Sequence, residues 1–171
     1  MFDTKKFLNF LAQKGYDYEV HEHAALFSVE DSNKSRGQIR GAHSKNLFLK
    51  NKKNEFFLFS CEEFSEINLK KISKTFSLGN LSFAKEEYLK KLLGIKPGSV
   101  TPFALLNDKE NKIVFYLEEQ LYRSEFLNFH PLTNTKTVNM KTKQFIKFMI
   151  ENNKKIHIFS SAEGIVIKIY E

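Results

Sequence analysis

The chain has 171 residues and an apolar fraction of 42%, which is enough for one domain with a sizeable core, and no linker-like tract divides it. Its single cysteine, Cys61, excludes an internal disulfide and a zinc cluster of thiolates. Lysine and arginine (27) outnumber aspartate and glutamate (20), and the net charge of +7 suits a polyanionic partner such as nucleic acid, although scattered lysines also suit an ordinary solvated surface.

The N-terminus and the overall pattern add two expectations. The first six residues lack the apolar core of a signal peptide, and no segment is long enough to span a membrane, so we expect a cytoplasmic protein with no membrane partner. The sequence has no internal repeat and no low-complexity segment, so we expect a single domain over residues 1–171.

Apolar periodicity and capping residues predict the elements of the first half of the chain. Asn68, for example, can cap a helix whose apolar residues Leu69 and Ile72 share one face. In chain order we predict a helix from Asp3 or Thr4 to Gly15, a strand over 16–20, a short helix opened by the capping box Ser28–Asp31, a loop over 36–41, strands over 47–49 and 56–59 joined by a turn at 51–54, the helix after Asn68 and a strand over 81–83.

The second half of the chain follows the same rules. An apolar run over 103–106 and an alternating run over 113–117 predict two strands that form a hairpin. Helices and strands interleave with several such hairpins, which predicts an α+β fold with a mixed, mainly antiparallel sheet and packed helices. The other predicted elements are a helix over 85–93 ended by Gly94, a strand at 138–140, a helix capped by Thr142, and strands over 155–159 and 165–169.

The stretch Leu93–Phe103 contains two of the three prolines and two of the seven glycines. Proline presets φ at the first corner of a turn and glycine accepts a positive φ at the next, so Pro97–Gly98 predicts a tight turn. Pro102 biases Thr101 to an extended conformation. On its own the pattern fits a plain helix-to-strand connection, and also a rigid rim of peptide groups that a ligand could approach closely.

Three polar stretches could carry chemistry, namely residues 41–46, 98–102 and 128–135. None of them is a phosphate-binding P-loop, a dinucleotide fingerprint, a zinc-protease helix or a nucleophile elbow. Ser44 and Ser99 have no identifiable base partner, which argues against a serine triad. His21 and His23 would share one side of a strand, but no third ligand is near, so we predict no metal and no cofactor.

The most specific stretches are Gly41–Leu49, Leu92–Phe103 and Asn128–Asn134. Together they resemble the YbaK/ProX family of free-standing aminoacyl-tRNA editing proteins, which is related to the editing domain of bacterial prolyl-tRNA synthetases. The resemblance runs nearly end to end and favours the ProX branch, which deacylates alanine mischarged on proline tRNA. It implies one aminoacyl-tRNA editing domain with that family's fold, which hydrolyses the ester of Ala-tRNA(Pro) in trans and without metal.

The resemblance also implies roles for residues. The family's G-x-x-x-P loop falls on Gly98–Pro102, whose backbone would hold the aminoacyl-adenosine end, and its functional lysine falls on Lys45, which would pair with a phosphate near the acceptor terminus. His130 would orient ribose, ester or water and could serve as a general base. The implied partners are tRNA and prolyl-tRNA synthetase. The expected catalytic residues are Lys45, Gly98 and His130, and the expected substrate-binding residues are Asn46, Leu47, Ser99, Val100, Thr101, Pro102 and Phe103.

The need for such editing has an energetic basis. A pocket built for proline cannot strongly reject alanine, because each missing methylene is worth only about 1–3 kcal/mol. A second site that is too small for proline inverts this selection, and Val100, Phe103 and Leu47 are its candidate walls. Without the family, Lys45 would be interpreted as a surface lysine and His130 as a loop histidine with satisfied hydrogen bonds.

Three alternatives stay open at this point. Relatives with a different pocket would hydrolyse another small aminoacyl ester, such as that of serine, threonine or cysteine. A tRNA-binding or regulatory module without catalysis would bind tRNA in a salt-sensitive way and release no amino acid. A protein-interaction domain would do neither, so a panel of mischarged tRNAs separates all three.

Overall fold

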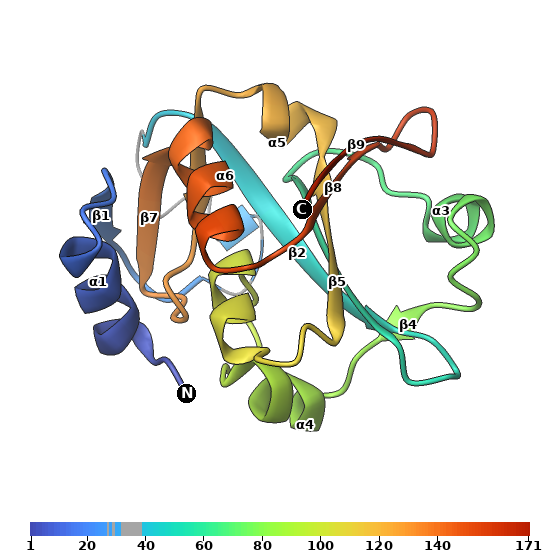
Figure 1. Cartoon of the computed structure of the whole chain (residues 1–171), viewed down its shortest axis with the longest axis horizontal. Coiled ribbons are helices and arrows are strands. Elements are labelled where there is room, and N and C mark those ends of the chain that lie inside the picture. Colours follow the sequence, from blue (N-terminus) through green and yellow to red (C-terminus); the bar gives the residue numbers. More distant parts are fainter. Residues whose placement is uncertain (27, 29, 32–38) are drawn as a thin grey trace.

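The computed structural model describes residues 1–26, 28, 30–31 and 39–171, and every structural statement below refers to these residues. Its nine strands form one sheet in the order β1-β7-β6-β2-β3-β5-β8-β9, with β4 paired to β2 (Figure 1). The strands are β1 (Glu19–Glu22), β2 (Ala42–Lys50), β3 (Phe56–Glu62), β4 (Ser82–Phe83), β5 (Ile113–Glu118), β6 (Phe126–Phe129), β7 (Lys136–Lys141), β8 (Ile156–Ser160) and β9 (Ile165–Tyr170).

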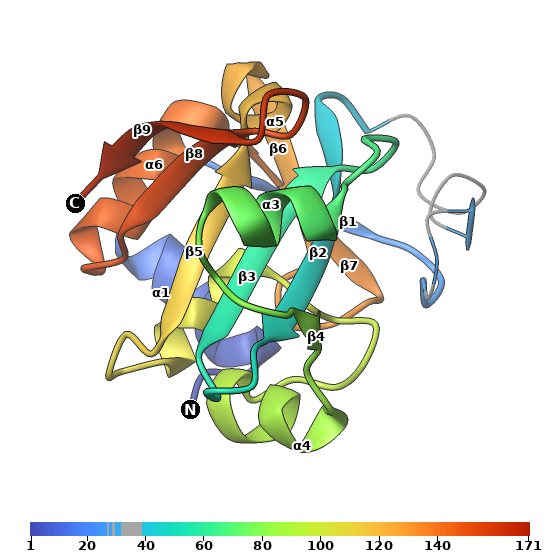
Figure 2. The same cartoon turned by 90° about the vertical axis from the view of Figure 1, so that its right-hand side faces the viewer.

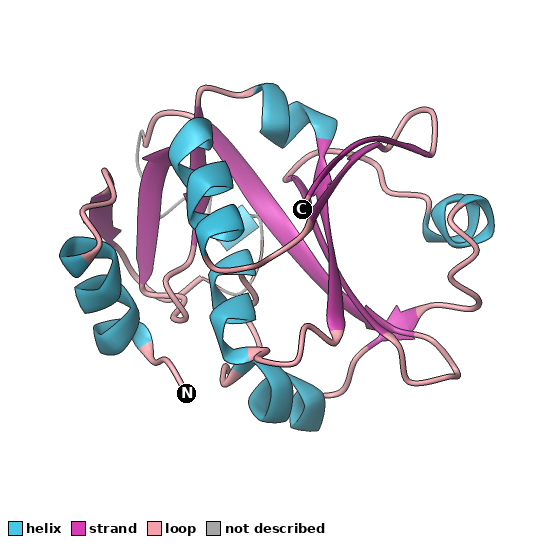
Figure 3. Cartoon of the chain, viewed as in Figure 1, coloured by secondary structure: helices cyan, strands magenta, loops and turns pink. Residues whose placement is uncertain are grey.

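The helices lie on both sides of this sheet (Figure 3). They are α1 (Thr4–Gln13), α3 (Leu69–Thr75), α4 (Glu86–Tyr88), the π-helix η1 (Leu89–Leu93), the 3-10 helix η2 (Pro102–Asn107), α5 (Glu119–Arg123) and α6 (Thr142–Glu151). None of these helices combines the length and the apolar character needed to cross a membrane.

The sheet is mixed, and antiparallel pairs outnumber parallel ones. β2 pairs antiparallel with β3 and β4, as do β1 with β7, β6 with β7, and β8 with β9. β2–β6, β3–β5 and β5–β8 are parallel. The predicted α+β class with a mainly antiparallel sheet is therefore confirmed.

Side-chain alternation divides the core into two clusters, one on each face of the sheet. The larger cluster collects Phe7 of α1, Phe103 of η2 and Phe145 of α6. The smaller one lies under α3, where Ile72 packs against Phe59 and other strand residues, and Figure 2 shows α3 in front of β3 on this face. Burial on both faces explains why β3 has the continuous apolar sequence that predicted a covered strand.

Several local predictions are confirmed with their physical reason. The carboxylate of Asp3 accepts the Lys6 N–H (2.8 Å) and caps α1, and Asn68 Oδ1 accepts the Lys71 N–H (3.0 Å) and caps α3. Gly94 follows η1 with φ of 67°, which ends the predicted helix where expected.

The predicted strand over 103–106 is wrong. Thr101 Oγ1 accepts the Phe103 N–H (3.3 Å), and Pro102 takes the first position of η2, so the run starts a helical turn. β5 is a strand as predicted, but it has no hairpin partner at 103–106. It pairs in parallel with β3 and β8 instead.

Three further differences complete the comparison. α5 and β6 were not predicted, and β6 begins before the polar stretch at 128–135 that concealed it. Lys141, and not Thr142, occupies the N-cap position of α6 and makes no capping bond with its side chain, while the Thr142 hydroxyl donates to the Ser124 carbonyl. The predicted helix at 28–31 and loop at 36–41 lie in part outside the described residues.

Candidate functional site

The strand β2 places its polar residues on opposite faces of the sheet. Asn46 lies on the face of the larger core cluster, where its Oδ1 accepts the buried Ser60 hydroxyl (2.5 Å). Leu47 packs against the smaller cluster on the other face. Because side chains alternate along a strand, Lys45 shares the face of Leu47, and not that of Asn46.

Lys45 and His130 come from neighbouring parallel strands. β2 and β6 pair Ala42 with Leu127 and His43 with Asn128, and the pairing ends two residues before Lys45 and His130. Leu127 and Phe129 point into the larger core cluster, so His130 belongs to the opposite face, which is also that of Lys45.

A glycine permits this close strand pair. Gly41 has φ of 91°, and a Cβ at this position would lie 2.5 Å from the Phe126 carbonyl oxygen at the start of β6. Any side chain here would therefore both strain the backbone and separate β2 from β6.

The edge of β2 is open between its two neighbours. Pairing with β6 ends at His43, and pairing with β4 begins at Leu49. The Ala84 N–H donates to the Phe48 carbonyl (2.9 Å), so the peptide groups of Phe48, and by alternation those of Asn46, face this edge. No strand in the described part of the chain pairs with the Asn46 peptide on this side, which leaves its backbone donor and acceptor facing the opening.

The loop 94–101 joins η1 to η2. It leaves η1, whose preceding residue Tyr88 contacts Phe56 (ring centroids 5.0 Å apart). It enters η2, where the Phe103 ring contacts Phe129 of β6 (5.7 Å). Phe56 pairs with Lys50 at the far end of β2.

The predicted turn at Pro97–Gly98 is confirmed. The Ser99 N–H donates to the Lys96 carbonyl (3.1 Å), and Gly98 has φ of 84°. Thr101 is extended (φ −156°, ψ 146°), as its position before Pro102 predicts. In the predicted G-x-x-x-P segment Ser99, Thr101 and Pro102 are buried, and only Gly98 and the half-buried Val100 reach the surface.

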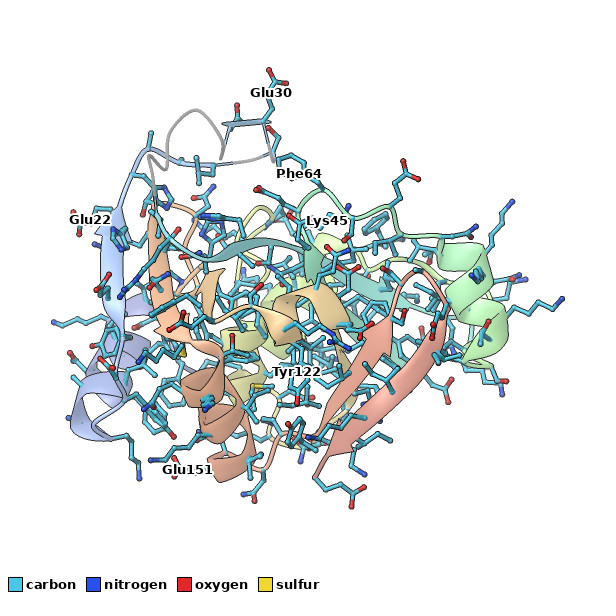
Figure 4. All side chains as sticks on the ribbon, turned by 90° about the horizontal axis from the view of Figure 1, so that it is seen from above. Glu22, Glu30, Lys45, Phe64, Tyr122 and Glu151 are labelled. Carbon is cyan, nitrogen blue, oxygen red and sulfur yellow. The ribbon has the colours of Figure 1, made fainter. Side chains whose placement is uncertain are left out.

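The Lys45 ammonium is held by a turn that follows β3. Its Nζ donates to the Ser65 carbonyl, and Figure 4 shows Lys45 and Phe64 at the same end of the molecule. Beneath it, Cys61 is fully buried, and burial together with the Glu118 carboxylate raises the pKa of the thiol, although Lys45 opposes this shift. The thiol is therefore protonated and inert, as expected for a structural cysteine.

His130 is held as a neutral ring. Its Nδ1 lies 2.8 Å from the Lys136 carbonyl oxygen, an atom that can only accept, so Nδ1 carries the proton and Nε2 keeps a lone pair. Burial lowers the pKa of His130, the Lys136 hydrogen bond opposes this, and nearby His23 adds to the lowering (ring centroids 6.0 Å apart). An acceptor nitrogen at neutral pH can orient a water molecule or remove its proton.

The structure thus gathers some of the expected site residues and separates others. Lys45 and His130 share a face, and the Asn46 backbone lies at the open edge between β6 and β4. The pocket wall expected from Val100, Phe103 and Leu47 is wrong, because Leu47 belongs to the opposite cluster from the other two. Phe103 has no exposed surface, since the rings of Phe7, Phe129, Phe145 and Phe148 surround it.

Two residues at this site were not singled out from the sequence. Glu118 is completely buried at the end of β5, where it accepts the Glu62 N–H (2.7 Å) and the Ser161 hydroxyl. Phe64 is 67% exposed and directly precedes Ser65, whose carbonyl accepts the Lys45 ammonium. The position of Glu118 at the end of an apolar strand is a sequence signal that could have identified it. No pattern in the sequence distinguishes Phe64 from the other phenylalanines.

The described residues contain no group of three or more His, Cys, Asp or Glu side chains arranged to hold a metal ion. His23 instead bonds within the protein, through Nδ1 to the Ala24 carbonyl and through Nε2 to Thr137 Oγ1, each at 2.8 Å.

Comparison with known proteins gives the family. Residues 23–148 match the family model described as "Aminoacyl-tRNA editing domain". "Prolyl-tRNA synthetase associated domain-containing protein 1" of Xenopus laevis is 37% identical over 133 residues, which cover 75% of this chain and 79% of that protein. "Prolyl-tRNA editing protein ProX" of Acetoanaerobium sticklandii is 28% identical over 137 residues, covering 80% and 84%.

A solved structure agrees with the fold. A protein assigned provisionally as a trans-editing enzyme for prolyl tRNA synthetase superposes with a TM-score of 0.67 at 18% identity, covering 91% of this chain and 96% of that one. At this identity the likeness concerns the fold alone. The family model and the relatives carry the assignment: the chain belongs to the aminoacyl-tRNA editing domain family and is by class an aminoacyl-tRNA deacylase.

Proposed function

We propose that this chain is a single editing domain that hydrolyses the ester bond of alanine mischarged onto proline tRNA, acting in trans. The observation that carries the proposal is the parallel pairing of β2 and β6, whose continuations carry Lys45 and His130 on one face of the sheet. A cation can bind a phosphate near the ester, and a neutral acceptor can position the water that attacks it. The names of two relatives point to proline tRNA and its synthetase.

Each of these residues would have its own role. Lys45 would bind the phosphate next to the terminal nucleotide, because it is a compact cation whose ammonium the Ser65 carbonyl holds in place. The exposed Gly98 peptide, together with the Asn46 backbone at the open edge of β2, would hold the aminoacyl-adenosine end. His130 would orient the attacking water through Nε2.

The reaction needs no protein nucleophile. Water adds to the ester carbonyl, the bond between the acyl carbon and the ribose oxygen breaks, and the proton lost by water ends on that ribose oxygen. The neighbouring ribose hydroxyl would help to activate the water. The products are alanine and tRNA with a free terminal hydroxyl, and backbone N–H groups would stabilise the negative oxygen of the intermediate.

Selection for alanine would come from size. Val100 is the partly exposed apolar residue of the G-x-x-x-P segment, so it is the candidate for excluding the proline ring. Replacing Val100 by Ala should enlarge the site and let the enzyme hydrolyse correctly charged Pro-tRNA(Pro). Association with prolyl-tRNA synthetase also belongs to this proposal.

A panel of charged tRNAs tests the proposal. We expect release of alanine from Ala-tRNA(Pro) at a rate well above release of proline from Pro-tRNA(Pro), and above release of serine, threonine or cysteine from the same tRNA. Faster release of one of those three amino acids would replace alanine as the substrate. Salt-sensitive tRNA binding without any release would make the chain a binding module and overturn the proposal.

A further inference from the structure

The turn Glu62–Ser65, between β3 and the loop that leads to α3, is fixed by four successive backbone N–H groups. The Glu62 N–H donates to the buried Glu118 carboxylate (2.7 Å), and the Glu63 N–H donates to the His43 carbonyl (3.0 Å). The Phe64 and Ser65 N–H groups donate to the side chain and the carbonyl of Glu62 (2.8 and 3.1 Å). With every donor of the turn bound, its backbone geometry is predetermined.

The side chain that this rigid turn presents is Phe64. Its ring is 67% exposed, whereas the residues on either side, Glu63 and Ser65, are buried. The next carbonyl along the chain, that of Ser65, accepts the Lys45 ammonium. An apolar ring and a cation are therefore held next to each other at the surface, and Figure 4 shows both at the edge of the molecule.

We propose that Phe64 is a stacking platform for a nucleobase at the 3′ end of the RNA, beside the phosphate that Lys45 binds. This inference rests on the proposed function, because it takes the phosphate contact of Lys45 as given. Every base has an aromatic face, so a planar ring adjoining a phosphate site recognises single-stranded RNA without reading its sequence. The base is either that of the terminal nucleotide or that of the one before it.

The charges of the turn favour a base over a second phosphate. Glu62 and Glu66 flank Phe64, and their carboxylates would repel the RNA backbone. A neutral base is not repelled. The Lys45 ammonium would thus bind the phosphate of the RNA end, and the Phe64 ring would stack on a base.

Phe83 provides a matched control. It is 65% exposed, nearly the same as Phe64, but it lies in β4 beside Leu49 at the other end of β2 from Lys45. Exposed single phenylalanines are common and need no function, so the two rings allow position to be separated from exposure.

The test compares Phe64→Ala, Phe64→Trp and Phe83→Ala on Ala-tRNA(Pro). We expect Phe64→Ala to raise KM about 5- to 150-fold, the range for losing one stacked base, with kcat changed less than about 2-fold. Phe64→Trp should keep KM close to that of the unaltered protein, because tryptophan also stacks on a base. Phe83→Ala should have the same KM as the unaltered protein. An unchanged KM for Phe64→Ala, or an equal rise for Phe83→Ala, would overturn the proposal.

Fluorescent bases at the 3′ end of the tRNA show which base stacks on Phe64, and this measurement does not depend on hydrolysis. Uncharged tRNA(Pro) is prepared with 2-aminopurine as the terminal base or a fluorescent cytosine analogue just before it. The unaltered protein should change the fluorescence of one of the two probes, and Phe64→Ala should abolish that change. No Phe64-dependent change with either probe refutes stacking, whereas absence of alanine release with a normal probe signal refutes the proposed function and leaves stacking supported.

Discussion

The two faces of the β7-β6-β2 part of the sheet differ sharply in composition. On one face Phe129, Val138 and Met140 join Phe103 and Phe145 in a core that excludes water. On the other face the same strands present Asn128, His130 and Lys45, with Thr137 and Asn139 beside them. Strand alternation keeps the two sets apart, so substitutions of the buried phenylalanines should change stability, and substitutions of Lys45 should change activity.

The largest expected effect is on the core face. Phe103→Ala removes a fully buried ring that contacts four other phenylalanines and should lower the free energy of unfolding by about 3–5 kcal/mol. Urea titration measures it, with exposed Phe83→Ala as the control that should change little. A cost below about 1 kcal/mol would contradict the assignment of Phe103 to the core.

On the polar face, Lys45→Ala should leave the protein folded and reduce kcat/KM for Ala-tRNA(Pro) by about 10- to 150-fold. This corresponds to losing one charged contact worth about 1.5–3 kcal/mol. Steady-state deacylation measures the loss. Lys53→Ala, in the exposed turn between β2 and β3, is the control for lost positive charge. Equal activities of the two variants would show that Lys45 does not bind the substrate.

Gly98 connects backbone conformation to activity. Its φ of 84° should make Gly98→Ala cost about 1–2 kcal/mol of stability, and the change should also lower deacylation if the Gly98 peptide touches substrate. Gly15→Ala is a matched control, since Gly15 has φ of 70° with nothing within 4 Å of an added Cβ. Gly15→Ala should lose a similar amount of stability and keep normal activity. Full activity of Gly98→Ala would show that the loop only connects η1 to η2 and does not contact the substrate.

The smallest effect concerns pH. Burial places the pKa of His130 below its usual 6.5, so the unfolded chain takes up a proton before the folded protein does as pH falls. Stability should therefore decrease below about pH 6.5 and level off beneath the folded-state pKa. Burial also lowers the pKa of His157, so the comparison is with His130→Asn, whose unfolding free energy should fall less between pH 7.5 and 5. An equal fall in both proteins would show that His130 does not titrate in this way.

Local chemistry explains which elements the sequence could predict. Asp3 and Asn68 cap helices, and Pro97–Gly98 forms a turn, because each depends on only a few neighbouring residues. The run 103–106 is equally apolar as a strand or a buried 3-10 helix, and only the cap at Thr101 decides between them. The polar Asn128 and His130 disguised the short strand β6.

The arrangement of the site depends on pairings between distant segments, which no single stretch encodes. The sequence suggests Leu47 as a core residue near Val100 and Phe103, but strand alternation sends Leu47 to the opposite face. Glu118 became visible only when β5 was placed beside β3, which brings its carboxylate to the Glu62 N–H.

The contact between Gly41 and Phe126 bears on how variants of this protein are interpreted. A Cβ at Gly41 would lie 2.5 Å from the Phe126 carbonyl oxygen and push β2 away from β6, the two strands whose continuations carry Lys45 and His130. In a genetic screen for lost editing, Gly41 would score as strongly as a residue that touches the ester. Loss of function at this position would therefore show that the strands of the site are misaligned. Residues identified in such a screen could be called catalytic only after those that merely align the strands had been excluded.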